Sequence, residues 1–152
     1  MIGGGRKTLG AAAIGAMLAG CAARPASYVD GVAGPDAVAV AAQAADMIGA
    51  KAQPPGPSLA LAPVPARQAG NPVTPALLNT LRARRYALAA EPADGTRRVN
   101  YAVVPVEGFV VVRVAVDGWD MARALSRGRD GRLVPAAPLF METPAGTEGD
   151  AP

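Results

Sequence analysis

Residues 99–125 read VNYAVVPVEGFVVVRVAVDGWDMARAL, and this stretch carries the clearest secondary-structure pattern of the chain. It holds three β-rich runs joined by two short turns, at residues 99–106, 109–116 and 119–125. Asp117-Gly118, between the last two runs, is a strong hairpin signal, because two-residue hairpin turns need the positive φ angles that Gly, Asn and Asp tolerate. In the middle run every second residue from Val110 to Val116 is a valine, which matches the two-residue period of a strand. The stretch therefore predicts an antiparallel β-meander.

Two helices are expected before the meander. Pro35 is suited to the start of a helix over 35–50, with Asp36 in the first turn, where the helix dipole favours a negative charge. Helical spacing places an apolar, alanine-rich face on this helix, made of Val38, Ala41, Ala45 and Ile48. Thr74 is the expected N-cap of a second helix over 75–85, with its leucines at helical spacing at positions 77, 78 and 81.

Short strands are expected on either side of the second helix, at 58–62 and 86–90. Pro63 and Pro65 favour an edge position or a strand end for the first of them. Strand, helix and strand in this order favour a βαβ or split βαβ unit. The predicted fold class is α+β: a small domain over 35–141 with an antiparallel β-meander and two helices packed on one face. A short strand at 132–134 and a disordered tail over 142–152 complete the expectation.

The N-terminal segment 1–20 has the layout of a bacterial lipoprotein signal. Arg6 and Lys7 form a positive region, an apolar stretch covers 9–18, and Cys21, the only cysteine, follows small residues. This apolar stretch is too short for a permanent membrane span of roughly twenty residues. The layout predicts cleavage and acylation at Cys21, followed by a lipidated tether over 21–34. An ordinary secretory signal with a chance cysteine is the alternative.

Composition excludes the commonest enzyme chemistries. The chain has no histidine, and its one cysteine would be consumed by the lipid, so Ser-His and Cys-His pairs and zinc sites built from these residues are not expected. No catalytic residue, metal or cofactor is therefore expected, although an enzyme that uses carboxylates alone stays open. Two of the fifteen basic residues leave with the signal, which lowers the net charge from +3 to +1. Direct nucleic-acid binding is not expected at this charge, nor is a small-molecule substrate.

Arginines gather at two places, which are candidate surfaces for contact with other proteins. Arg82, Arg84 and Arg85 lie at the end of the second predicted helix, and a second group falls at positions 127, 129 and 132. The alternative, which general surface composition favours, is a solvated helix end for the first group and a charged turn for the second. An exposed sheet edge is the other candidate contact surface, because strand addition at an edge is a common mode of binding.

The sequence resembles the family of the conjugal transfer protein TrbH, a small lipoprotein of conjugative elements. Four features carry the likeness: the signal ending at Cys21, the alanine-rich helix followed by Pro54-Pro55-Gly56, the segment TPALLNTLRARRYAL at 74–88, and the hairpin region that ends in Leu-Ser-Arg at 125–127 and is followed by GRLVP at 131–135. The chain departs from the family pattern at Arg85, where glycine is more usual, which leaves the geometry of that helix end open.

The resemblance implies a structural role in a conjugative type IV secretion apparatus, with other proteins of that apparatus as partners. Ala22 follows Cys21, where lipoproteins of the enterobacterial kind retained in the inner membrane commonly have Asp. The expected location is therefore the outer membrane, lipid-anchored and facing the periplasm. The alternative function is that of a generic periplasmic lipoprotein for envelope assembly or protein binding.

Overall fold

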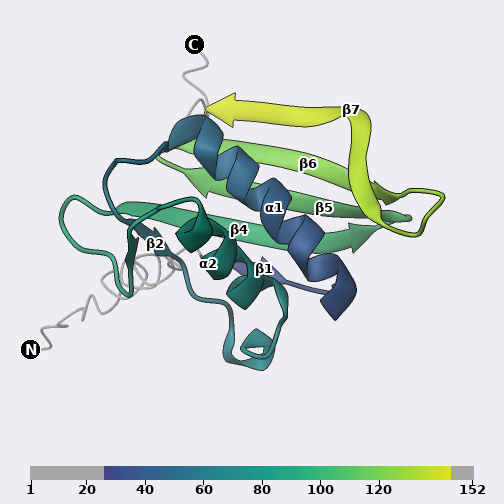
Figure 1. The fold of residues 1–152 in the computed structure, drawn as a ribbon, viewed down its shortest axis with the longest axis horizontal. Helices are drawn as coiled ribbons and strands as arrows, with labels where there is room; N and C mark the ends of the chain where they lie inside the picture. Colours follow the sequence, from purple (N-terminus) through teal and green to yellow (C-terminus); the bar gives the residue numbers. More distant parts are fainter. Residues whose placement is uncertain (1–25, 145–152) are drawn as a thin grey trace, which may run out of the picture.

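The computed structural model describes residues 26–144, with side chains as far as residue 136. Two helices lie across one face of a single mixed sheet (Figure 1). The sheet order is β3-β2-β4-β5-β6-β7, and β1 also pairs with β4. The helices are α1 (Gly34–Lys51) and α2 (Val73–Ala83), and a short 3-10 turn spans Ala66–Gln68. The strands are β1 (Tyr28–Val29), β2 (Leu59–Leu61), β3 (Leu88–Ala89), β4 (Arg97–Val106), β5 (Phe109–Val116), β6 (Trp119–Arg127) and β7 (Leu133–Pro144).

The predicted meander is confirmed. Strands β4 to β7 pair antiparallel in chain order, and the register places Val106 opposite Phe109 and Val116 opposite Trp119. Both two-residue turns have positive φ at each central residue, 44° and 86° at Glu107-Gly108 and 49° and 78° at Asp117-Gly118. These are the angles that match the twist of a hairpin. The register is therefore set by the turns that the sequence predicts.

The helices and the alternating strand residues enclose one core. Val112, Val114 and Val116 of β5 are buried beneath the helices, as their alternation predicts. Small residues bring α1 close to its neighbours: a Cβ added at Gly49 would lie 3.2 Å from the Tyr86 hydroxyl. The predicted face of α1 is partly wrong, because Val38 is 68% exposed. Packing against both the sheet and α2 buries a wider face instead, made of Ala37, Val40, Ala41, Ala44, Ala45, Met47 and Ile48.

The strand-helix-strand prediction is also confirmed, as an unsplit βαβ unit. β2 and β3 pair directly and in parallel, with Leu59 opposite Leu88 and α2 between them in sequence. Of the two positions that Pro63 and Pro65 favour for β2, the edge position is wrong, because β2 lies between β3 and β4. The prolines instead mark the end of the strand. Its other neighbour, β4, also runs parallel to it.

Two predicted boundaries differ from the structure. Residues Tyr28–Val29, expected in the tether, form β1 and pair in parallel with β4. The expected strand at 132–134 is the start of the much longer β7, which continues to Pro144 and so includes the first residues of the expected tail. Tertiary pairing adds both segments to the sheet, and neither has a strong strand pattern of its own. The expected signal, the first residues of the tether up to 25 and the tail from 145 onward lie outside the described residues.

Ser27 completes the sheet where β2 ends and β1 begins. The Ala62 N–H donates to the Val99 carbonyl at 2.8 Å, and the Ser27 N–H donates to the Pro63 carbonyl at 3.0 Å. Between these two hydrogen bonds, the Tyr101 N–H donates to the Ser27 Oγ at 3.2 Å instead of to a strand carbonyl. Ser27 is fully buried, so its side chain replaces a missing backbone acceptor in the interior.

Replacing Ser27 by Ala is therefore expected to destabilise the fold. The Tyr101 N–H would remain buried without an acceptor, which costs about 1–3 kcal/mol. Urea unfolding of the soluble domain measures the change. Ser126→Ala is the matched control, because Ser126 is only partly buried and lies on the face of the sheet away from the helices. Equal stability of the two variants would show that the Ser27 hydrogen bond contributes nothing.

Candidate protein-contact surface

The predicted site residues fall into two parts. Cys21 lies outside the described residues, so its acylation stays a prediction. Arg82, Arg84 and Arg85 lie at the C-terminal end of α2. The structure therefore tests only the arginine group as a surface.

Arg85 terminates α2 in a left-handed conformation, with φ of 66°. Its N–H donates to the Arg82 carbonyl at 2.9 Å, and the Tyr86 N–H donates to the Leu81 carbonyl at 3.0 Å. This pair of bonds is the Schellman motif, in which glycine is favoured at the position that Arg85 occupies. The glycine usual in the resembling family would therefore fit this geometry with less strain.

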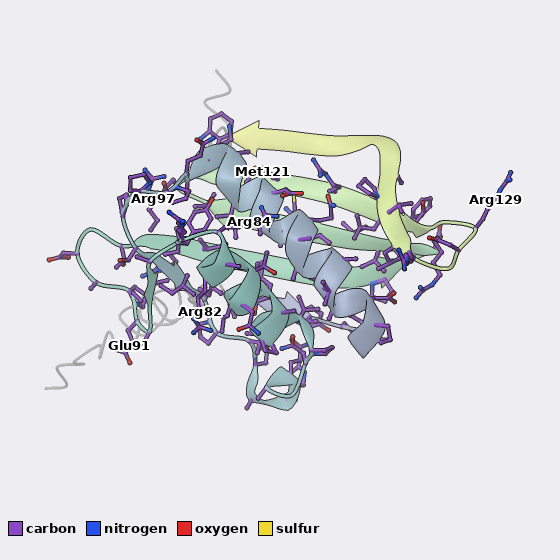
Figure 2. All side chains as sticks on the ribbon, in the orientation of Figure 1. Arg82, Arg84, Glu91, Arg97, Met121 and Arg129 are labelled. Atoms are coloured by element: carbon purple, nitrogen blue, oxygen red, sulfur yellow. The ribbon has the colours of Figure 1, made fainter. Side chains whose placement is uncertain are left out.

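The three arginines do not form one patch. Arg84 bonds to Asp46 of α1 at 2.7 Å and ties the two helices together. The neighbouring Tyr86 has its pKa raised by burial, and the charge of Arg84 partly opposes that rise. Arg82 is exposed, with a long 3.4 Å contact from its Nη1 to the Asn79 Oδ1. Arg82 and Arg85 are therefore the exposed members, and Arg82 is the one that borders a groove (Figure 2).

An apolar groove lies beside Arg82. It is a hollow of about 350 Å³ between α2 and the strands β2 and β3. Leu61 and Leu88 line its strand side, and Leu78 and Arg82 line its helix side. Leu78, predicted to share the core face of α2, is only partly buried and faces this groove, whereas Leu77 and Leu81 are fully buried. The α2 groove thus combines apolar side chains with one cationic group.

A buried polar network fixes the groove and the start of α2. The Tyr101 hydroxyl lies 2.6 Å from the Thr74 Oγ1. Burial raises the pKa of Tyr101, and the Thr74 hydrogen bond partly opposes that rise. The Thr74 N–H donates to the Asn71 Oδ1 at 2.8 Å. Thr74 as the N-cap is therefore wrong: the helix begins at Val73, and Asn71 supplies the oxygen that the helix end needs.

The edges of the sheet are poorly suited to strand addition. The backbone groups of Trp119 and Leu125 form their hydrogen bonds with β5. The β7 residues opposite them, Pro144 and Pro135, therefore direct their backbone nitrogens away from β6, towards the outer edge of the sheet. Proline is tolerated there, and it removes donors that an added strand would use. β3, at the other edge, has only two residues. The Val29 N–H of β1 is already bonded to the Gln68 Oε1 at 2.9 Å.

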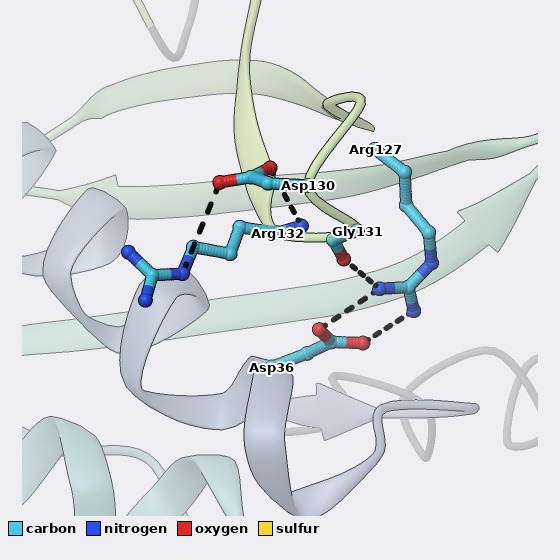
Figure 3. A network of polar contacts seen from close by, with 5 residues as sticks. All are labelled: Asp36, Arg127, Asp130, Gly131 and Arg132. Carbon is cyan, nitrogen blue, oxygen red and sulfur yellow. Dashed lines mark hydrogen bonds and ion pairs between the residues drawn. The ribbon is translucent and has the colours of Figure 1, made fainter.

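The second arginine group is divided in the same way. The Arg127 guanidinium bonds to the Asp36 carboxylate of α1 and, through Nη1, to the Gly131 carbonyl at 2.8 Å (Figure 3). The hydrogen bond and the charge of Asp36 raise the pKa of Arg127. Arg132 makes a 3.9 Å contact with Asp130, and Arg129 projects from the β6–β7 turn, far from Arg82 (Figure 2). Arg127 therefore holds α1 to the sheet.

Two long-range contacts were missed from the sequence. Asp36 and Arg127 are 91 residues apart, and the Lys51 ammonium lies 3.6 Å from the centre of the Trp119 ring. No local pattern in the sequence signals such pairs. Within residues 26–144, no three His, Cys, Asp or Glu side chains are grouped closely enough to hold a metal ion. No helix in that range is long and apolar enough to cross a membrane.

Comparison with known proteins adds one match. A family model described as conjugal transfer protein TrbH matches residues 22–144, beginning directly after Cys21. No curated protein and no solved structure matches the chain. The family match covers most of the chain and agrees with the resemblance carried by its motifs. The chain therefore belongs to the conjugal transfer protein TrbH family and is a component of conjugal transfer.

Proposed function

We propose that the protein is a lipid-anchored structural component of a conjugative type IV secretion apparatus, held at the outer membrane and facing the periplasm. The observation that carries the proposal is the family match, which starts at Ala22, directly after the expected acylated residue. Acyl chains at Cys21 would hold the domain at the membrane, because two or more chains anchor a protein stably. The folded domain would supply contacts with other proteins of the apparatus.

The α2 groove is the proposed contact surface. Prolines remove edge donors from β7, β3 has only two residues, and Arg84 and Arg127 are engaged within the fold. Arg82 is exposed beside the apolar groove. An apolar segment carrying an acidic residue would fit both features, because apolar burial supplies affinity and the arginine orients a carboxylate.

Deletion of the gene tests the overall function. Loss of plasmid transfer with an intact envelope, restored by the wild-type gene, is the expected result. Envelope defects without loss of transfer would contradict the proposal and favour the generic envelope lipoprotein.

Arg82→Glu tests the contact surface. Reversing this charge is expected to lower transfer frequency at least tenfold in the complemented deletion strain, because a tenfold change corresponds to only about 1.4 kcal/mol of lost binding. Pull-down of the apparatus proteins measures the lost contact directly. Arg129→Glu is the control, since Arg129 lies on a turn remote from the groove. A loss of equal size in both variants would contradict a role for the groove.

A further inference from the structure

The face of the sheet opposite the helices, here called the open face, is largely apolar. In β4, β5 and β6 it carries several alanines and valines, including Ala102, Val104 and Val111, and the ion pair between Arg113 and Asp120 crosses it. An antiparallel sheet with one solvated face usually alternates apolar and polar residues. None of the described helices covers this face (Figure 1). The exposed apolar side chains of this face gather at one end of it, and an exposed apolar patch of this kind marks an interaction site.

The most exposed apolar side chains of this face form one row at its end. Val106, Phe109, Ser126 and Val134 are neighbours across β4, β5, β6 and β7. Val106 is 46% exposed, Phe109 39% and Val134 42%. These three side chains, called the apolar row, lie beside the Glu107-Gly108 turn.

The chain enters the fold on the same side, near the other end of the face. Ala26 and Arg98 line a common hollow of about 650 Å³. Arg98 is on the open face, because it alternates with the buried Val99. Ala26 precedes Tyr28, which pairs with Ala102, so it lies near the Asn100 end of β4. From there to Val106 is about 20 Å along the strand.

The expected anchor cannot be far from this entry point. Cys21 lies five positions before Ala26, and an extended chain of that length reaches at most about 18 Å. This reach of about 18 Å is close to the length of about 20 Å that separates the entry point from Val106 along β4. A lipid at Cys21 would therefore keep the open face near the bilayer surface, whereas turning the helices towards the bilayer would require this short segment to pass around the sheet.

We propose that the open face docks on the phospholipid surface to which Cys21 is anchored. This inference rests on the proposed lipid anchor. The anchor would fix one end of the face, and the apolar row would insert at the other end, as apolar side chains do at a membrane interface. Arg98 is exposed beside the entry point and would face lipid phosphates. Docking would leave α1 and α2 on the opposite side, directed away from the membrane (Figure 1).

The test uses the lipidated mature chain in phosphatidylethanolamine and phosphatidylglycerol vesicles. Because Cys21 is the only cysteine, an introduced cysteine is the one free thiol once Cys21 is acylated. An environment-sensitive fluorophore is attached at Ser126→Cys, between Phe109 and Val134 of the apolar row, or at Val38→Cys, exposed on α1. Brominated lipids are expected to quench the label at 126 several-fold more than the label at 38, and Phe109→Glu is expected to remove that difference.

Two results would overturn docking. One is equal, weak lipid quenching at both positions. The other is a label at 126 that is shielded from aqueous iodide but not quenched by lipid, which would mean that a protein covers the open face. Mass spectrometry checks acylation separately: an unacylated chain contradicts the proposed anchor alone. Docking is then measured with a Cys21→Ser variant in which an N-terminal histidine tag replaces residues 1–20. The tag holds this variant to vesicles that contain nickel-bearing lipid, and the same two labels are compared with the same expected outcomes.

Discussion

Cys21→Ser is expected to abolish acylation and processing, so that the mature form is lost and the 152-residue precursor accumulates. The signal peptidase of lipoproteins acts on a cysteine that already carries lipid, as the resemblance to that class implies. Serine has no thiol to form the thioether. Mass spectrometry of the membrane-extracted protein measures both effects, since the wild type should begin at residue 21 and carry acyl chains. A mature, membrane-bound form of the serine variant would contradict the anchor.

A second chain controls for the retained signal. The precursor of Cys21→Ser keeps its apolar stretch over 9–18 and can stay at the inner membrane through it. Replacing residues 1–21 by an ordinary cleavable secretory signal removes both the stretch and the cysteine. This chain is expected in the soluble periplasmic fraction, because without acyl chains the apolar row and one net positive charge attract lipid only weakly and reversibly. Its recovery in the outer-membrane fraction would show that lipid is not the anchor.

Leu77→Ala is expected to be the most destabilising single substitution considered for the folded domain. Leu77 belongs to α2, and its side chain is fully buried in the core. Truncating a buried leucine costs about 2–5 kcal/mol, through lost burial and the cavity that remains. The total stability of a domain is about 5–15 kcal/mol, so a large share would be lost. Urea unfolding of the soluble domain measures the change.

Leu78→Ala is the matched control in the next position. Leu78 lines the α2 groove and is only partly buried, so its truncation is expected to cost about 1 kcal/mol by lost apolar burial. Unlike Leu77→Ala, it is expected to weaken the partner contact more than the fold. Equal losses of stability at the two positions would contradict the packing of α2.

The strongest sequence signals predicted the fold well. The meander follows from the turns at 107–108 and 117–118 together with the two-residue alternation of β5, and both determine register locally. The βαβ unit likewise follows from short runs bounded by proline and glycine. These features depend on neighbours in sequence, so one sequence suffices to predict them.

Other features depend on neighbours that are remote in sequence. β1 is two residues long and is stabilised by β4 and by Ser27, some 74 residues from its partner Tyr101. Val38 has the right spacing for the predicted core face, but the direction of burial depends on where α2 lies. Of the predicted contact group, Arg84 is engaged by Asp46, whereas Arg82 is exposed beside the α2 groove. Cys21 stays a prediction from the sequence alone.

The most direct measurement is the plasmid transfer frequency of a deletion strain complemented by the wild type or by the soluble periplasmic chain that lacks Cys21. The domain is the same in both, and only the lipid attachment differs. The wild type is expected to restore transfer, whereas the soluble chain, at equal abundance, is expected not to. Full restoration by the soluble chain would show that this protein does not act in conjugal transfer as a lipid-anchored component.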